Sequence, residues 1–497
     1  MNHLKRPRRP RVALPGLGSA VALLTLVGCQ SYERVPLDLA DHRAAFDTRL
    51  DTTEPISRFV DRLAEQGHAV PDRFDPSDGL SVAEGEVLAL FYNADLRIAR
   101  LDAGVALATF ETAGLWEDPQ FGFDGAEILS PAGPFEYGLT LSLTIPVSGR
   151  LGVEKDRAGA AYEAELRRIV DAEWSTRAAV RSAWASWSVA SERLRLLLEV
   201  IGQVERVAEI TDRLEAAGEL TRVEARLLRA ELVQTRADVA QATLDEARAR
   251  IALLGLMGLA PDAAVDLLPT IQPVLPTTHS DTIDRLIEAN TLLAVRRAEY
   301  RVAEESLRLE VRKQYPDITV GSGFGSEDND DRVLLGVSLP IPILNTNRAG
   351  IAEARARRQV ARVAAETTFE QLSRELTLSR AAYDAARMQR AAFERELVPM
   401  LDEQSAEVEQ LINLGEVNTL LLLETVTRRF DAKSRLLDLR LAEIAAAVEI
   451  DRLLGPDQTE SPVPVWPSND ENNQHTTNTS ATGNTPADAS TTNEDSR

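Results

Sequence analysis

The sequence has one cysteine, Cys29, and five histidines that lie far apart. A single cysteine excludes a disulfide framework within the chain, and the scattered histidines do not form the usual Cys/His pattern of a zinc site. Aromatic residues make up only 5% of the 497 residues, and 55 basic residues face 78 acidic ones, for a net charge of −23. This balance argues against a nucleic-acid partner, because a phosphate backbone binds basic surfaces.

Catalytic motifs are also missing from the sequence. It contains no phosphate-binding glycine loop, no nucleophile elbow and no HExxH pair. The carboxylates are abundant, but they recur along helical patterns without the signature of a pocket. We therefore predict that the protein is not an enzyme and that it has no cofactor and no bound metal.

The N-terminus reads as a targeting segment. A basic start containing Lys5 and Arg11 precedes an apolar run over residues 12–27, which is typical of a secretory signal peptide. The string Leu26-Val27-Gly28-Cys29 resembles the bacterial lipobox. That resemblance implies cleavage after residue 28 and acylation of Cys29 with fatty acids such as palmitate. Each buried methylene contributes roughly 0.8 kcal/mol to membrane anchoring.

The residue after the cysteine is Gln30. It is not the Asp that retains many bacterial lipoproteins in the inner membrane, so the lipobox resemblance implies the outer membrane. The alternative is an ordinary signal peptide with an incidental cysteine.

The remainder of the chain contains an internal repeat. Asn93 and Pro119 are 26 positions apart, as are Asn290 and Pro316, and the two copies are offset by 197 (290 − 93). Further strings recur in the same order at similar offsets: Gly218-Glu219 as Gly415-Glu416, Leu143-Thr144-Ile145-Pro146 as Leu339-Pro340-Ile341-Pro342, and Leu254-Gly255 as Leu454-Gly455. A duplicated unit over roughly 81–256 and 279–456 follows from this order.

Each copy is predicted to contain a helix, two strands, a very long helix and a further helix. The expected ranges are 84–113, 119–127, 136–146, 150–216 and 219–255, then 281–311, 316–324, 332–342, 348–413 and 416–454. The predicted domains are a lipoprotein signal peptide (1–28), an N-terminal anchor and periplasmic segment (29–80), the first repeat (81–260), a linker (261–278), the second repeat (279–456) and a disordered tail (457–497).

The predicted strands alternate between apolar and small polar residues. One face of the second strand carries Tyr137, Leu139, Leu141, Leu143 and Ile145, and its counterpart carries Val333, Leu335, Val337, Leu339 and Ile341. This pattern fits membrane strands, although a soluble hairpin with one covered face would share it. Four strands are too few to close a barrel, so several chains must complete the sheet. Strand counting leaves both two and three chains open.

With these features, the chain resembles the TolC-like outer-membrane efflux proteins, and in particular the outer-membrane factor lipoproteins. The local strings that carry the resemblance are Ser142-Leu143-Thr144-Ile145-Pro146, residues 337–345 and Leu411-Ile412-Asn413-Leu414-Gly415-Glu416. The family fold is mainly α-helical with a membrane β-barrel. The resemblance implies a homotrimer whose twelve-stranded barrel continues into a periplasmic helical tunnel, with a periplasmic adaptor protein, an inner-membrane pump and outer-membrane lipid as partners.

The resemblance also implies a gate at the periplasmic tip. The family places acidic residues shortly after the turn glycine of each copy, and the matching positions here are Glu224, Leu421 and Glu424. Leu421 departs from that pattern, and a solvated helix face is the ordinary alternative for the two glutamates. The adaptor-docking turns would contain Gly218, Glu219, Gly415 and Glu416.

The predicted function is a passive outer-membrane duct that exports small molecules or metal ions. Residues 340–348 are similar to the branch that serves cobalt–zinc–cadmium pumps, which favours metal ions over drugs. One alternative is a lipid-anchored coiled-coil scaffold without a pore. Another is an outer-membrane duct for protein secretion.

Overall fold

The computed structural model describes residues 32, 34–127, 129, 135–272, 282–327, 330–413, 419–456 and 464. The predicted signal peptide, Cys29, Gly415 and Glu416 lie outside these residues, as does the predicted tail apart from Pro464. The chain divides into two compact units, residues 1–46 and 47–497. Helix α2 (Leu39–Asp47) spans this division, and all the other described elements belong to the second unit.

The second unit contains the predicted element types in the predicted order. After α3 (Glu54–Glu65), the first copy contains α4 (Val82–Tyr92), α5 (Ala94–Thr112), β1 (Gln120–Ala126), β2 (Glu136–Ile145), α6 (Arg150–Ala217) and α7 (Arg222–Leu256). The second copy contains α8 (Thr282–Ala289), α9 (Thr291–Arg312), β3 (Ile318–Glu327), β4 (Asp330–Ser338), α10 (Arg348–Ala392), the π-helix η1 (Phe393–Leu397), α11 (Val398–Asn413) and α12 (Thr419–Leu454). The duplicated unit is therefore confirmed.

The first helix of each copy is broken, where the sequence predicted one continuous helix. The breaks lie at Asn93 and Asn290, and each asparagine caps the helix that follows it. The Nδ2 of Asn93 donates to the carbonyl of Leu256 at 3.0 Å, and that of Asn290 donates to the carbonyl of Leu453 at 2.9 Å. An asparagine side chain satisfies the free N–H groups of a helix start. Here it also ties that start to the end of the copy's last helix.

A glycine follows this tie in each copy. Gly258 and Gly455 both have positive φ, and a Cβ there would lie 2.5 Å from the carbonyl oxygen of Tyr92 and 2.1 Å from that of Ala289, respectively. Gly455 is 197 positions after Gly258. The glycine that corresponds to Gly455 is therefore Gly258, and the predicted match with Gly255 was wrong by three positions.

The long helix of the first copy is continuous, whereas that of the second is not. Helix α6 has 68 residues, or roughly 100 Å at about 1.5 Å per residue. In the second copy, η1 interrupts the predicted helix just before Pro399. Proline lacks an N–H and collides with the carbonyl four residues earlier in a regular α-helix, and a π-turn is one way to relieve that conflict.

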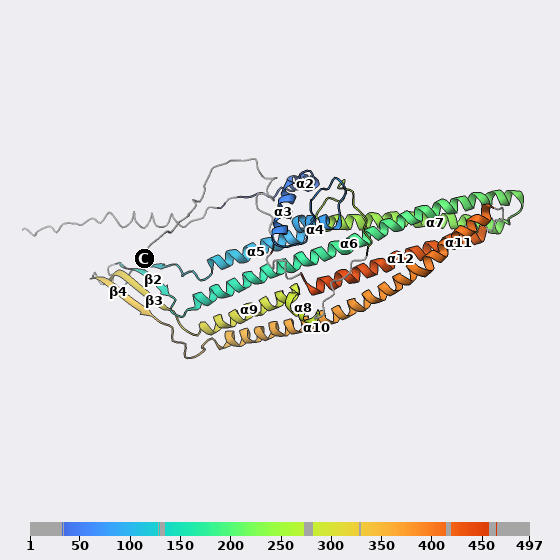
Figure 1. Cartoon of the computed structure of the whole chain (residues 1–497). Helices are drawn as coiled ribbons and strands as arrows, with labels where there is room; N and C mark the ends of the chain where they lie inside the picture. Colours follow the sequence, from blue (N-terminus) through green and yellow to red (C-terminus); the bar gives the residue numbers. More distant parts are fainter. Residues whose placement is uncertain are drawn as a thin grey trace, which may run out of the picture. The chain divides into compact units, whose positions relative to one another are not determined.

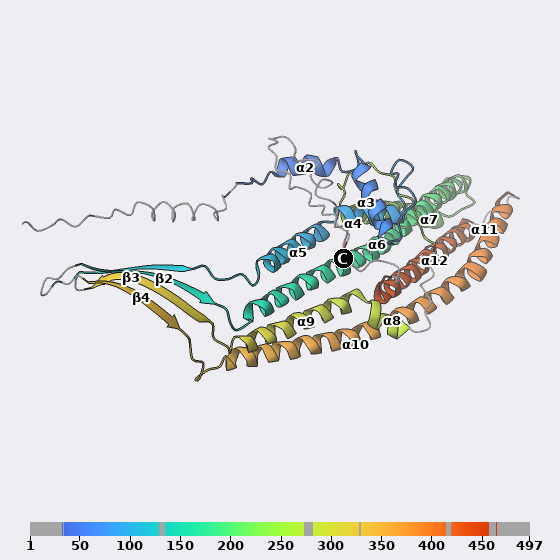
Figure 2. The same cartoon turned by 60° about the vertical axis from the view of Figure 1, so that its left-hand side comes forward.

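The four strands form one antiparallel sheet in the order β1-β2-β3-β4. Strand β4 ends at Ser338, not at residue 342 as predicted; Pro340 and Pro342 follow it and cannot donate to a ladder. The sheet lies at one end of the layer formed by α5, α6, α9 and α10, and the α6–α7 turn lies at the other end (Figures 1 and 2).

The largest hydrophobic core lies where α3 and α4 meet the middle of α6 and the end of α7. Trp184 is fully buried there, and its indole N–H donates to the carbonyl of Leu268 at 3.0 Å. Leu267 forms a parallel bridge with Leu80, so the first part of the predicted linker packs on this core. Over the described residues, none of the helices combines the length and hydrophobicity needed to cross a membrane.

Candidate functional site

The strand register places the apolar residues of all four strands on one face of the sheet. Leu139 pairs with Phe123 on one side and with Phe324 on the other, and Phe324 pairs with Val333. Directly opposed residues of an antiparallel sheet share a face. We call this the apolar face, and its residues include Phe121, Phe123, Leu139, Leu141, Leu143, Val320, Phe324, Val333, Leu335 and Val337.

The opposite face consists mainly of glycine and polar residues. Gly122, Thr140, Gly323 and Leu334 form one row across it, and Leu334 is the apolar exception in that row. We call this the polar face. On the apolar face, Phe121, Phe123, Leu335 and other large side chains are exposed, and every residue of β4 is exposed. The two faces predicted from the sequence are present, and the described chain leaves the apolar one uncovered.

A polar cluster joins the two copies where the sheet meets the helices. The carboxylate of Asp317, just before β3, accepts from the Ser148 hydroxyl at 2.8 Å and from Arg150 Nε at 2.6 Å. Arg150 also donates to Glu117 at 2.7 Å. These contacts fix the start of α6 to the start of β3. Sequence reasoning missed them, because residues 167 positions apart leave no local signal.

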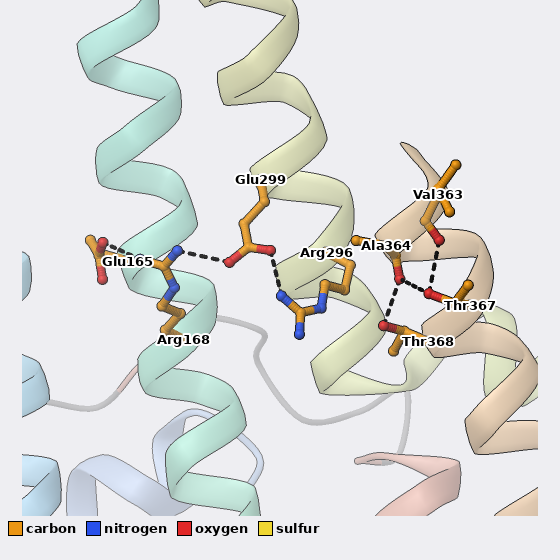
Figure 3. A network of polar contacts seen from close by, with 8 residues as sticks. All are labelled: Glu165, Arg168, Arg296, Glu299, Val363, Ala364, Thr367 and Thr368. Atoms are coloured by element: carbon orange, nitrogen blue, oxygen red, sulfur yellow. Dashed lines mark hydrogen bonds and ion pairs between the residues drawn. The ribbon is translucent and has the colours of Figure 1, made fainter. Parts of the chain in front are cut away.

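Further along the layer, ion pairs hold α6 to α9. Figure 3 shows Glu299 of α9 between Arg168 of α6 and Arg296 of its own helix, with both distances at 2.8 Å. Burial opposes ionisation of Glu299, but hydrogen bonds from the two arginines outweigh it and lower the pKa of this carboxyl. Helix α10, with Thr368 donating to the Ala364 carbonyl at 2.7 Å, lies beside α9 (Figure 3).

At the far end of the layer, α6 turns into α7 through a glycine cap. Gly218 is left-handed, with φ of 78°. The N–H of Glu219 donates to the Leu214 carbonyl at 2.9 Å, and that of Gly218 donates to the Glu215 carbonyl at 3.1 Å. This bond pattern is a Schellman motif. Gly415 and Glu416, the matching turn residues of the second copy, lie outside the described residues.

Glu224 lies in the first turn of α7, where it forms a capping box with Thr221. Its carboxylate accepts from the Thr221 hydroxyl at 2.7 Å and from the Thr221 N–H at 3.0 Å. These two hydrogen bonds lower the pKa of the Glu224 carboxyl. The Thr-x-x-Glu spacing of such a box is readable from sequence, and our sequence reasoning overlooked it.

The other two gate candidates lie at the start of α12. Glu424 pairs with Arg428 on the same helix at 2.5 Å. The Leu421 side chain is exposed, and its carbonyl accepts from the Thr425 hydroxyl at 2.8 Å. Among the residues that the structure describes, no hydrogen bond joins Glu224 to Glu424. Within one chain, both carboxylates are thus engaged on their own helices.

The tips of the two copies differ in a further pair of positions. Arg229 of α7 bonds to Asp212 and Glu215 of α6, at 2.7 and 2.5 Å. The residue 197 positions later is Val426, which is buried. At this position the first copy has an ionic tie between helices and the second an apolar residue, although Arg429 and Lys433 of α12 still pair with Asp402 of α11.

The described chain joins an exposed apolar sheet face to a duplicated layer of long helices, and a large exposed apolar patch is typical of a membrane-associated protein or a protein interface. The family model described as "Outer membrane efflux protein" matches residues 88–259 and 282–456. The chain therefore belongs to the outer membrane efflux protein family, as the sequence resemblance predicted.

Two curated relatives and two solved structures illustrate this membership. The cobalt-zinc-cadmium resistance protein CzcC of Cupriavidus metallidurans is 24% identical over 317 residues, which cover 63% of this chain and 76% of CzcC. The outer membrane protein OprJ of Pseudomonas aeruginosa is 25% identical, with 88% of this chain and 95% of OprJ covered.

Among solved structures, a membrane protein from Pseudomonas aeruginosa has a TM-score of 0.67 at 23% identity, covering 76% of this chain and 91% of that one. The outer-membrane channel OprN has a TM-score of 0.66 at 18% identity, covering 80% and 96%. These structures share the fold.

Proposed function

We propose that three copies of this outer-membrane efflux protein close their sheets into one twelve-stranded barrel that continues into a helical tunnel. The duct passes small molecules or metal ions outward from an inner-membrane pump, which reaches the tunnel tip through a periplasmic adaptor. Within each chain, β1 and β4 are the open edges of the sheet. Open edges in lipid leave backbone groups unpaired, so β4 of one copy pairs with β1 of the next.

The observation that carries this proposal is a difference in burial between equivalent helices. Val295 and Ala298 of α9 are 4% and 6% exposed, in contact with the layer inside the chain. Their equivalents on α5, Ile98 and Leu101, are 59% and 73% exposed. Helix α6 packs on α9 within the chain. In the repeat, α10 is the equivalent of α6 and α5 is the equivalent of α9, so we expect α10 of a second copy to cover α5.

The cargo is proposed from the same residues that suggested it in the sequence. The string 340–348 is similar to the branch that serves cobalt–zinc–cadmium pumps, and CzcC is itself named for resistance to those metals. We therefore propose metal ions before drugs. A scaffold without a pore is not favoured, because it has no use for the apolar face.

Cysteine pairs across the proposed β4–β1 boundary test closure. Inside the chain, the base of β2 pairs with the base of β3, with Ile145 opposite Ile318. We expect β4 and the residues after it to meet β1 of a second copy in the same way. Phe123→Cys combined with Val337→Cys or Leu339→Cys, on the apolar face, should give a disulfide-linked dimer on non-reducing gels.

The control for this test combines Phe123→Cys with Ser338→Cys. Side chains alternate between faces along a strand, so Ser338 projects from the polar face and should not cross-link to position 123. The parent protein, which retains Cys29, reports the background. A Ser338 pair as efficient as the others, or no dimer from any pair, would contradict a closed sheet.

The gate proposal is tested by conductance in lipid bilayers. Glu224→Gln combined with Glu424→Gln removes two charges per chain, while glutamine can still occupy a capping box. If both carboxylates line the pore, single-channel conductance and cation preference should change. Thr221→Ala is the control, because it removes the cap partner and keeps both charges. Equal effects of the two variants would assign Glu224 to the helix start instead of the pore.

A further inference from the structure

Four short segments connect the helix layer to the sheet, and they form two kinds of joint. The inner joint lies within the chain and consists of residues 146–149, between β2 and α6, and residues 313–317, between α9 and β3. The outer-joint segments are residues 113–119, between α5 and β1, and residues 339–347, between β4 and α10. They lie at the two open edges of the sheet, and no hydrogen bond between described backbone groups joins one of them to the other.

One half of each joint begins with the same turn. The Val147 N–H donates to the Ile145 carbonyl at 3.0 Å, and the Ile343 N–H donates to the Ile341 carbonyl at 2.9 Å. Two residues then lead into α6, but four lead from Ile343 into α10. The added length begins with Leu344, which is 91% exposed, beside Ile343 at 79%. The second copy has thus extended its joint with an apolar residue where the first has Ser148.

The other segment of each joint, which precedes the first strand of its copy, is also more apolar in the outer joint than in the inner one. Counted back from the proline before each first strand, Leu115 and Trp116 occupy the positions of Arg312 and Lys313. Both apolar side chains are exposed. The position of Asp317, the centre of the inner joint, is occupied by Gln120. Among the described residues, the bonds of Ser148 and Arg150 to Asp317 therefore have no equivalent between the two outer segments, whose Glu117 and Asn347 bond to Arg150 and Glu310.

We propose that Leu115 and Trp116 of one copy pack against Ile343 and Leu344 of a neighbouring copy, as an apolar joint between subunits. The inference rests on the proposed closure of the sheet, which brings the bases of β4 and β1 together. The inner halves bind each other through Ser148, Arg150 and Asp317. Each outer half instead presents exposed apolar side chains, and its polar residue, Glu117 or Asn347, bonds within its own chain. By analogy with the inner joint, the outer half beside β1 of one copy contacts the outer half beside β4 of the next copy, because apolar surfaces associate in water.

A second copy fits these residues better than lipid does. The two apolar halves lie beside β1 and β4, the two edges that meet when the sheet closes. Contact with lipid alone would not explain why the apolar residues lie at these two edges. Val147 and Tyr315, at the inner joint, are also exposed, but that joint is held within the chain by the bonds of Ser148 and Arg150 to Asp317. The apolar extension is confined to the edge where a neighbour arrives.

Cross-linking of the full-length protein in outer membranes tests the joint directly. Trp116→Cys with Leu344→Cys should form a disulfide-linked dimer between chains. Tyr315→Cys with Leu344→Cys is the matched control, because Tyr315 is an exposed aromatic residue of the inner joint. If Phe123→Cys with Leu339→Cys cross-links but Trp116→Cys with Leu344→Cys does not, the sheet closes and the apolar joint is wrong. If neither pair reacts, closure itself fails.

A charge at equivalent positions separates a second copy from lipid as the cover. Ile343→Asp should make the trimer dissociate at a lower temperature, whereas Val147→Asp, at the matching turn of the inner joint, should leave that temperature near the parent value. Equal losses from the two variants would show a cover that both positions share, such as lipid, and would overturn the proposal. An unchanged Ile343→Asp trimer would overturn it as well.

Discussion

Leu141→Arg combined with Leu335→Arg should remove the protein from the outer membrane almost completely. Both side chains lie in the same row of the apolar face, midway along their strands. An arginine on the lipid face of a membrane strand costs about 2–4 kcal/mol near the bilayer midplane, and three copies would carry two each. Membrane fractionation and the yield of folded trimer measure the loss.

The matched control for this variant shifts each substitution by one residue. Thr140→Arg combined with Leu334→Arg places the same two charges on the polar face, in the adjacent row. The trimer should then still assemble, with altered conductance. If both double variants are lost equally, the two faces do not differ in their surroundings, and the membrane assignment of the apolar face is wrong.

Cys29→Ser should abolish fatty-acid labelling of the protein entirely. The lipobox prediction makes this thiol the acceptor of the first acyl chain, and serine cannot be modified in the same way. Metabolic labelling with a palmitate analogue, followed by gel electrophoresis, measures it. Residual labelling at the parent level would contradict the lipobox.

The residue after the cysteine offers a control. Gln30→Asp preserves the acceptor and introduces the residue that retains many lipoproteins in the inner membrane. The labelling should persist, while the protein moves to the inner-membrane fraction. A Gln30→Asp protein that remains in the outer membrane would show that the barrel alone decides the location.

The fold could be predicted wherever a period or a spacing carries the information. The two faces of the sheet follow from strict alternation, because a period of two residues assigns Leu139 and Leu141 to one side regardless of partners. The duplication follows from landmarks at a constant offset, such as Asn93 and Asn290. A glycine at position 218 predicted the turn, because a left-handed cap favours that residue.

The features that escaped prediction depend on tertiary contacts or on conflicts within a helix. Asn93 ends one helix because its side chain reaches Leu256, 163 positions away. Pro399 perturbs a helix that its Ala- and Leu-rich neighbours favour, so the pattern predicted continuity. The candidate gate was placed by resemblance, which locates Glu224 but says nothing of its hydrogen bonds to Thr221.

The number of strands in each chain has a consequence for how copies can be added. With four antiparallel strands, the sheet starts and finishes on the same side, and its first and last strands run in opposite directions. The last strand of each copy therefore runs opposite to the first strand of the next copy. A ring of any number of copies can close with antiparallel pairs at every junction. Deletion of a single strand would leave the first and last strands running in the same direction, so identical chains that point the same way would meet in a parallel pair at every junction.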